Sequence, residues 1–221
     1  MRFADGVEVV GVDGDDTLWL CQDGFDDAEA VLAQALGPQF AGVLDQVSRR
    51  NLRLYGYGVK AWALNCIEAG APAEQVLGLA RDLLSGPVEL LPGAAAAVDA
   101  LAAAHRLVLV TKGDLVDQRR KLAASRLAGR FDHVEIVADK DVAAYEQLLR
   151  FLGCPPDRFL MVGNSEVSDV APVLDAGGWA VHVPHTTTWS LERADPTPHP
   201  RRAQVGSLGQ VPTLLQGRLQ G

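Results

Sequence analysis

A cluster of acidic residues directly follows an apolar segment near the beginning of the chain. The segment Val7–Asp13 ends in acid, and Asp15, Asp16 and Thr17 come next. Carboxylates this close repel one another, and burying them is costly unless a cation or hydrogen bonds offset their charge. Their oxygens are hard ligands of the kind that Mg²⁺ prefers. The cluster therefore indicates a site for chemistry that involves a cation.

Three later apolar segments also end in residues suited to phosphate or metal chemistry. The carboxyl ends of parallel strands lie at one edge of a sheet, where ligands of open α/β sheets bind. We therefore expect carboxylates, a hydroxyl, lysines and backbone N–H groups to gather beside Asp13, which is the composition of a site for Mg²⁺ and phosphate. These residues are Thr111, Lys112, Gly113 and Asp114; Asp139, Lys140 and Asp141; and Gly163, Asn164, Ser165 and Asp169.

Strands and helices alternate along most of the chain. Short Val-rich runs are typical of strands buried on both faces, and strands separated by helices form a parallel sheet with right-handed crossovers. The pattern predicts an α/β fold with a three-layer, Rossmann-like core. Strands are predicted over 7–13, 106–111, 133–138, 158–163 and 179–183, with an edge strand over 203–205, helices over 92–105, 114–127, 141–152, 168–176 and 208–215, and a loop over 186–202.

The stretch between the first strand and Leu91 has a different pattern. Apolar residues recur at helical spacing over 25–36, 40–68 and 72–84, with Gly and Pro at the breaks between these segments. No strand pattern interrupts them. We therefore predict an all-helical insertion over 21–90, carried by an α/β core made of residues 1–20 and 91–221.

Composition narrows the possible classes of protein. The 221 residues are 48% hydrophobic and 22% charged, which is ordinary for a globular domain with an insertion. The net charge of −8 argues against nonspecific nucleic-acid binding, which needs a cationic surface. No apolar run is long enough to predict a membrane span. Asp5 and Glu8 interrupt any signal-peptide core, and Cys21, Cys66 and Cys154 lack zinc-site spacing, so we expect a cytoplasmic protein with reduced thiols.

The acidic turn and the later strand ends resemble the four motifs of the haloacid dehalogenase-like (HAD) hydrolase superfamily, whose members are mostly phosphatases. The motifs come in the family's order, on both sides of the helical insertion, and that insertion is similar to the family's helical cap. The matching residues are Asp13-Gly14-Asp15-Asp16-Thr17 for the first motif, Thr111 for the second, Lys140 for the third, and Gly163-Asn164-Ser165 with Asp169 for the fourth.

The resemblance implies a role for each matching residue. Asp13 would attack phosphorus to form an aspartyl-phosphate, and Asp15 would protonate the leaving oxygen and then activate water. Thr111 and Lys140 would hold and neutralise the phosphoryl group. Thr17, Lys112 and Gly113 are further candidates for substrate binding. Mg²⁺ would be held by the Asp13 carboxylate and the Asp15 backbone carbonyl, together with a residue of the fourth motif.

Two positions qualify the resemblance. Haloacid dehalogenases of this superfamily lack the second aspartate of the first motif, so Asp15 favours phosphate-ester hydrolysis over dehalogenation. Asn164 stands where the family usually has a metal-binding carboxylate. Its side-chain oxygen is neutral, so we expect weaker Mg²⁺ binding than usual, with Asp169 as an alternative ligand.

The leading hypothesis is thus a Mg²⁺-dependent phosphatase that acts on a small phosphorylated metabolite. Two alternatives stay open: a phosphomutase of the same fold, and a catalytically weak binding or regulatory protein. The substrate and the oligomeric state are not predicted.

The remaining noticeable residues favour structural interpretations. Aromatic residues in the helical stretch are more typical of packing than of a substrate pocket. The histidines after the fifth strand lack a third metal ligand nearby. The basic run 119–121 is typical of a solvated helix face. The residues concerned are Trp19, Phe25, Tyr55, Tyr57 and Trp62; His182, His185 and Trp189; and Arg119, Arg120 and Lys121.

Overall fold

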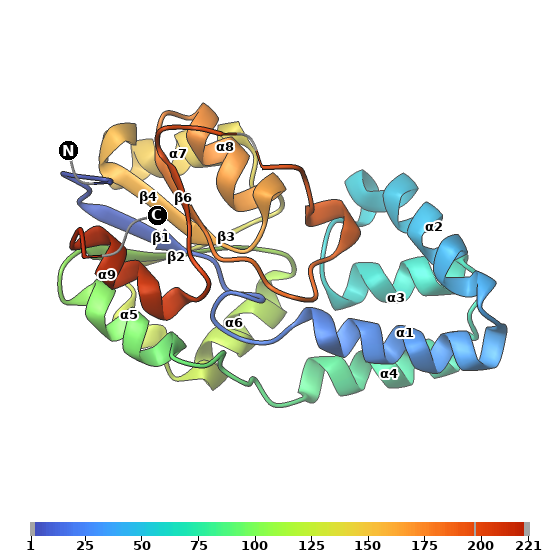
Figure 1. The fold of residues 1–221 in the computed structure, drawn as a ribbon. Helices are drawn as coiled ribbons and strands as arrows, with labels where there is room; N and C mark the ends of the chain where they lie inside the picture. The colour runs from blue at the N-terminus through green and yellow to red at the C-terminus, as the bar shows by residue number, and fades with distance from the viewer. Residues whose placement is uncertain (1–2, 197, 219–221) are drawn as a thin grey trace.

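Six parallel strands form the centre of the protein (Figure 1). The computed structural model describes residues 3–196 and 198–218. The strand order is β3-β2-β1-β4-β5-β6, so the first strand lies between β2 and β4. All four residues of β1 are buried, as expected for a central strand. The strands are β1 (Val9–Val12), β2 (Arg106–Lys112), β3 (His133–Val137), β4 (Phe159–Gly163), β5 (Trp179–His182) and β6 (Arg202–Gln204).

Helices cover both faces of this sheet. Helices α5 (Ala94–Ala102), α6 (Leu115–Ser125) and α9 (Val211–Leu215) lie on one face, and α7 (Val142–Leu152) and α8 (Ala171–Asp175) on the other (Figure 1). Each face has its own buried apolar cluster, because strand side chains alternate between the two sides. The predicted α/β fold with a parallel sheet and three layers is therefore confirmed.

Four further helices form a separate unit beside the core, which we call the cap (Figure 1). They are α1 (Gln22–Leu36), α2 (Gln39–Tyr55), α3 (Val59–Glu68) and α4 (Ala73–Ser85). Their apolar faces pack into a third cluster of buried side chains, distinct from the two clusters of the core. The two chain segments that join cap and core run side by side, since Leu20 donates to the Glu89 carbonyl and Leu91 to the Leu18 carbonyl.

The structure differs from the predicted elements in several places, one of them the helix predicted over 208–215, which is a 3₁₀ turn over Leu208–Gln210 followed by α9. The single helix predicted over 40–68 is two helices, because Gly56 and Gly58 adopt positive φ angles of 71° and 94° and turn the chain between α2 and α3. The helix predicted over 168–176 is preceded by a π-helical turn over Glu166–Val170. The loop predicted over 186–202 contains a short 3₁₀ turn at Ser190–Glu192. In the described part of the chain, no helix is both long and apolar enough to cross a membrane.

Candidate active site

A buried lysine joins two buried carboxylates at the carboxyl edge of the sheet. Lys140 Nζ lies 2.5 Å from Asp13 Oδ1 and 2.7 Å from Asp169 Oδ1. The three residues follow β1, β3 and β4, whose carboxyl ends lie along one edge of the sheet, with β2 between β3 and β1. The second Asp169 oxygen accepts from the Ser165 backbone N–H at 3.0 Å, so both oxygens of this carboxylate are engaged. Asp169 is therefore arranged to hold Lys140.

Asp13 itself is fixed by backbone and side-chain contacts. Its N–H donates to the Val162 carbonyl of β4 at 2.9 Å, which continues the strand pairing to the end of β1. Burial raises the pKa of the Asp13 carboxyl from 3.8 to about 7, and the neighbouring Asp169 adds to this rise while Lys140 opposes it. Without a metal, the pKa of Asp13 thus lies near neutral pH, where the carboxyl group changes its charge.

Two oxygens converge on the hydroxyl of Thr17. Thr17 Oγ1 lies 3.3 Å from Asp13 Oδ2 and 3.4 Å from Asn164 Oδ1. A hydroxyl carries one hydrogen, so it satisfies these two acceptors incompletely. The backbone of Asn164 is anchored separately, with its carbonyl 3.0 Å from His182 Nε2. Asp13 and Asn164 therefore present neighbouring oxygens with spare capacity for another donor or a cation.

Thr111 lines the same cavity from the end of β2. The residue is only 1% exposed, and its hydroxyl has no hydrogen-bond partner among the residues that the structure describes. Gly14 passes close to it, because a Cβ added to Gly14 would lie 3.3 Å from Thr111 Oγ1. The hydroxyl is thus available to donate to an oxygen of a bound anion beside Asp13.

Asp15 is held by three donors. Lys121 Nζ lies 2.9 Å from one of its oxygens, Trp19 Nε1 donates to the same oxygen at 2.7 Å, and Gln118 Nε2 donates to the other at 2.8 Å. Burial opposes ionisation of Asp15, but the charge of Lys121 and the three hydrogen bonds outweigh it and lower the pKa. Asp15 is therefore held as a carboxylate in this conformation.

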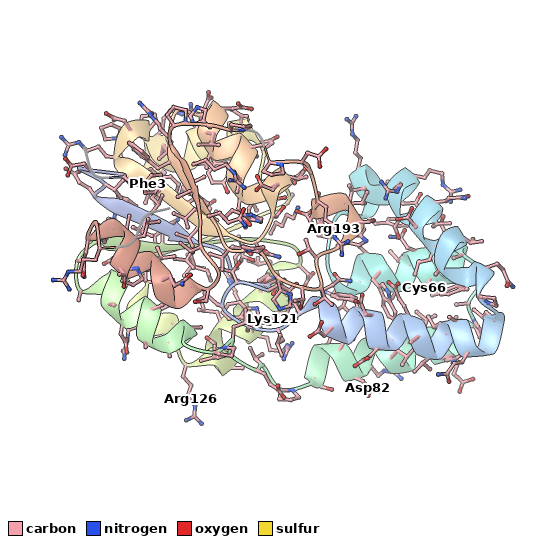
Figure 2. All side chains as sticks on the ribbon, viewed as in Figure 1. Phe3, Cys66, Asp82, Lys121, Arg126 and Arg193 are labelled. Atoms are coloured by element: carbon pink, nitrogen blue, oxygen red, sulfur yellow. The ribbon has the colours of Figure 1, made fainter. Side chains whose placement is uncertain are left out.

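The assignment of Lys121 to a solvated helix face was wrong. Lys121 is 8% exposed, and Figure 2 shows it between the core and the cap. The basic run spans three successive positions of α6, so its members point in different directions, and one of them faces the sheet edge. Charge composition alone could not identify which one.

A further ion pair lines the cavity. Lys112 Nζ lies 2.5 Å from Glu192 Oε1, and its other contacts are Ser168 Oγ at 2.6 Å, Asp139 Oδ1 at 3.8 Å and the Tyr57 ring, whose centroid is 3.7 Å away. The other Glu192 oxygen accepts from Ser165 Oγ and Ser168 Oγ at 2.5 and 2.6 Å. Burial opposes ionisation of Glu192, but Lys112 and the serines lower its pKa. A residue from the predicted loop thus completes the site.

The other predicted binding residues have structural partners. The N–H of Gly113 donates to the Val137 carbonyl at 3.2 Å, so this amide is not free for a phosphate. Asp114 caps α6 by accepting from the Val116 and Asp117 N–H groups. Asp16 accepts from the Cys21 and Gln22 N–H groups at the beginning of α1.

Cap and core together enclose a cavity of about 160 Å³. Packing was the favoured interpretation of the aromatic residues, and three from the cap, Phe25, Tyr57 and Trp62, also line this cavity. Trp189, from the loop after β5, also lines it. Trp19 is instead buried in the core beside Asp15. The histidines His182 and His185 do not line the cavity.

Comparison with known proteins places the chain in a family. A family model described as haloacid dehalogenase-like hydrolase matches residues 7–177. The chain belongs to this family of hydrolases, and the family resemblance seen in the sequence is confirmed.

Individual relatives differ in how much they share with the chain. A haloacid dehalogenase-like family hydrolase from Xanthomonas campestris is 35% identical, with a TM-score of 0.84 over 96% of this chain and 92% of that one. L-2-haloacid dehalogenase from Xanthobacter autotrophicus shares the fold, with a TM-score of 0.69 at 19% identity, over 96% of this chain and all of that one. A glyceraldehyde 3-phosphate phosphatase from Methanothermobacter thermautotrophicus is 31% identical over 91 residues, which span 39% of this chain and 40% of that protein.

The residues of the site can be tested for their fit to the Mg²⁺ ion that the family implies. Six carboxylates and three lysines line the cavity, which leaves an excess of three negative charges when all are ionised. Asp13 Oδ2 and Asn164 Oδ1 are hard oxygens beside one hydroxyl. In the described ranges, no three His, Cys, Asp or Glu side chains are grouped to hold a metal. The residues present therefore fit a Mg²⁺ ion, to which they would offer one carboxylate, one side-chain amide oxygen and a backbone carbonyl oxygen.

The buried Asp13 carboxylate generates a prediction about stability. Its folded-state pKa of about 7 lies above the unfolded value of 3.8, so its ionisation destabilises the metal-free protein increasingly from about pH 4 and fully above pH 7. Asp13→Asn removes this cost, while Asp169 remains a partner for Lys140. In EDTA we expect Asp13→Asn to raise the Tm at pH 8 by at least about 3 °C, and by less at pH 5.

Asp99→Asn, at an exposed carboxylate on α5, serves as the control for this measurement. Scanning calorimetry of all three proteins at both pH values gives the comparison. A Tm gain for Asp13→Asn that is equal at pH 5 and pH 8, or a loss at pH 8, would contradict the buried-charge explanation.

Proposed function

We propose that this hydrolase is a Mg²⁺-dependent phosphatase that acts on a phosphate monoester of a small metabolite. The observation that carries the proposal is that Asp13, paired with Lys140, shares one cavity with the second aspartate, Asp15, and with the unpartnered hydroxyl of Thr111. A nucleophile, a proton-transfer group and donors for phosphoryl oxygens are the groups that hydrolysis through an aspartyl-phosphate requires.

In the first step one bond to phosphorus forms and another breaks. An oxygen of the Asp13 carboxylate attacks phosphorus, and the bond from phosphorus to the alcohol oxygen breaks. Lys140 holds the Asp13 carboxylate and offsets the negative charge that collects there, while Thr111 donates to a phosphoryl oxygen. When bound, Mg²⁺ supplies further positive charge against the repulsion between carboxylate and phosphate, and Asp13, the Asp15 backbone carbonyl and Asn164 would hold it.

Asp15 serves the proton transfers of both steps. Held ionised by Lys121, Gln118 and Trp19, it is in the state that accepts a proton from water when water attacks the phosphoryl group of the intermediate. That attack releases phosphate and restores Asp13. In the first step Asp15 must take up a proton, which the monoanion of the phosphate ester can supply on binding, and give it to the alkoxide oxygen as the bond to phosphorus breaks. A leaving group that is stable as an anion needs no such proton. The proton that Asp15 takes from water in the second step then serves the next cycle or returns to solvent.

Two features favour phosphate esters over 2-haloacids. A haloacid has a carboxylate that needs a cationic partner, whereas no arginine of the described residues lines the cavity and each lining lysine already faces a carboxylate. The small volume of the cavity and the phosphatase name of the Methanothermobacter relative both support a small phosphorylated substrate. We also propose a cytoplasmic location, from the unpaired cysteines.

Hydrolysis of p-nitrophenyl phosphate tests the proposal, because nitrophenolate leaves without a proton. With Mg²⁺ we expect turnover by the wild-type protein and a loss of at least about a thousandfold in Asp13→Asn, since the nucleophile is gone. Asp99→Asn, the exposed control, should keep full activity. Chloride release from 2-chloropropionate should be absent. Undiminished turnover by Asp13→Asn, or dehalogenation with no phosphatase activity, would contradict the proposal.

Asn164 generates a second prediction, about metal affinity. A carboxylate at this position adds a charged ligand, so Asn164→Asp should lower the Mg²⁺ concentration for half-maximal activity by about tenfold. The measurement is a Mg²⁺ titration of p-nitrophenyl phosphate hydrolysis, with isothermal titration calorimetry of Mg²⁺ as a readout that does not depend on turnover. Saturation of the wild-type protein in the low micromolar range, or an unchanged midpoint in Asn164→Asp, would show that position 164 does not limit metal binding.

A further inference from the structure

A carboxylate on the cap faces the cavity without a cation beside it. Glu29, on α1, lines the cavity, and its Oε1 accepts from Trp62 Nε1 at 3.1 Å. Burial raises the pKa of Glu29, and the charged residues that act on it, Asp26 and Asp45, raise it further. Among the described residues, no lysine, arginine or histidine forms an ion pair with Glu29. The charge of this carboxylate is therefore uncompensated within the protein.

The cations of the cavity are already paired with other carboxylates. Lys112 faces Glu192, Lys121 faces Asp15, and Lys140 faces both Asp13 and Asp169. Within residues 3–196 and 198–218, no arginine lines the cavity. The lysines that line the cavity therefore all come from the core, with Lys140 beside Asp13 where the phosphoryl group would lie, and in the described residues none comes from the cap.

The cap residues that line the cavity include one carboxylate, Glu29, aromatic rings and neutral polar side chains. Phe25 and Trp62 pack edge to face, with ring centroids 6.0 Å apart, and both line the cavity. Aromatic rings and carboxylates together are the surroundings that bind organic cations.

From these contacts we propose that the alcohol part of the substrate carries an amine, bound as an ammonium group by Glu29. The substrate is then the phosphate monoester of an amino alcohol, with its phosphoryl group at Asp13 and its ammonium group at the cap. This inference rests on the proposed phosphatase function for the phosphoryl end. The inference about the ammonium end rests on Glu29 and on the aromatic rings beside it.

Competing substrate chemistries fit these surroundings less well. A terminal carboxylate would face Glu29 and repel it, with no cation to receive it. A hydroxyl would donate one neutral hydrogen bond, which is weaker than the charge-assisted bond of an ammonium group. An alkyl end would leave the Glu29 carboxylate desolvated and unpaired. The order of affinity expected at the cap end is therefore ammonium, hydroxyl, methyl and carboxylate.

Ligand binding tests this order without turnover. The proteins are Asp13→Asn, the same variant with Glu29→Gln, and the same variant with Glu74→Gln, a conservative change at an exposed glutamate of α4 as the control. The probes are ω-aminoalkyl phosphates with two to four carbons, with hydroxyalkyl, alkyl and carboxyalkyl phosphates of equal length. Calorimetry in Mg²⁺ gives each dissociation constant. Glutamine keeps the size of Glu29 and an acceptor for Trp62, so the cap should stay folded.

We expect the best aminoalkyl phosphate to bind about tenfold more tightly than its alkyl counterpart, and this ratio to fall to about two in Glu29→Gln. Glu74→Gln should keep the tenfold ratio. An equal preference for the amine in Glu29→Gln, or tighter binding of the hydroxyalkyl, alkyl or carboxyalkyl compounds than of every amine, would overturn the inference. The phosphatase proposal is judged separately, by p-nitrophenyl phosphate turnover in the wild-type protein.

Discussion

The buried ion pairs of Lys140 with Asp13 and Asp169 are the interaction on which the site depends. They join the ends of β1, β3 and β4, three strands of one sheet, through side chains that are at most 8% exposed. Removing Lys140 would leave two buried carboxylates without their cation, and breaking a buried ion pair in this way typically costs about 3–5 kcal/mol. The fold tolerates these charges because they sit where backbone N–H groups and opposite charges can reach them. The same arrangement holds Asp13 in place for attack.

The excess of negative charge in the cavity is the second constraint on the site. Each lysine of the cavity is matched to at least one carboxylate, and carboxylates still remain at the metal end and at the cap end. A cation from solution would balance the carboxylates at the metal end, and a cationic group of the substrate would balance the carboxylate at the cap end. The cap takes part because its α1 contributes Glu29 and because Tyr57, in the turn between α2 and α3, covers Lys112. Substrate selection and catalysis thus both depend on how the excess negative charge of this cavity is neutralised.

Local patterns in the sequence predicted the core and one part of the site. Buried Val-rich strands and the residues at their ends are local signals, so Asp13, Thr111, Lys140 and Asn164 could be placed at one edge. Lys121, Glu192 and Glu29 could not, because their roles depend on which way a helix faces or where a loop folds. Lys121 resembled a surface lysine, Glu192 lies in a polar loop, and Glu29 is one of several acids on α1. The turn at residues 56–58 was missed because the apolar helical spacing continues across it.

Detection of a phosphoryl group on Asp13 tests the central claim most directly. The protein is mixed with p-nitrophenyl phosphate and Mg²⁺, quenched in acid within the first turnover, digested, and the peptide that contains residue 13 is examined by mass spectrometry. The account predicts one added phosphoryl group, located on Asp13, which disappears when the quench is delayed until substrate is exhausted. Turnover with phosphate on another residue, or with an unmodified Asp13 at every quench time, would contradict it.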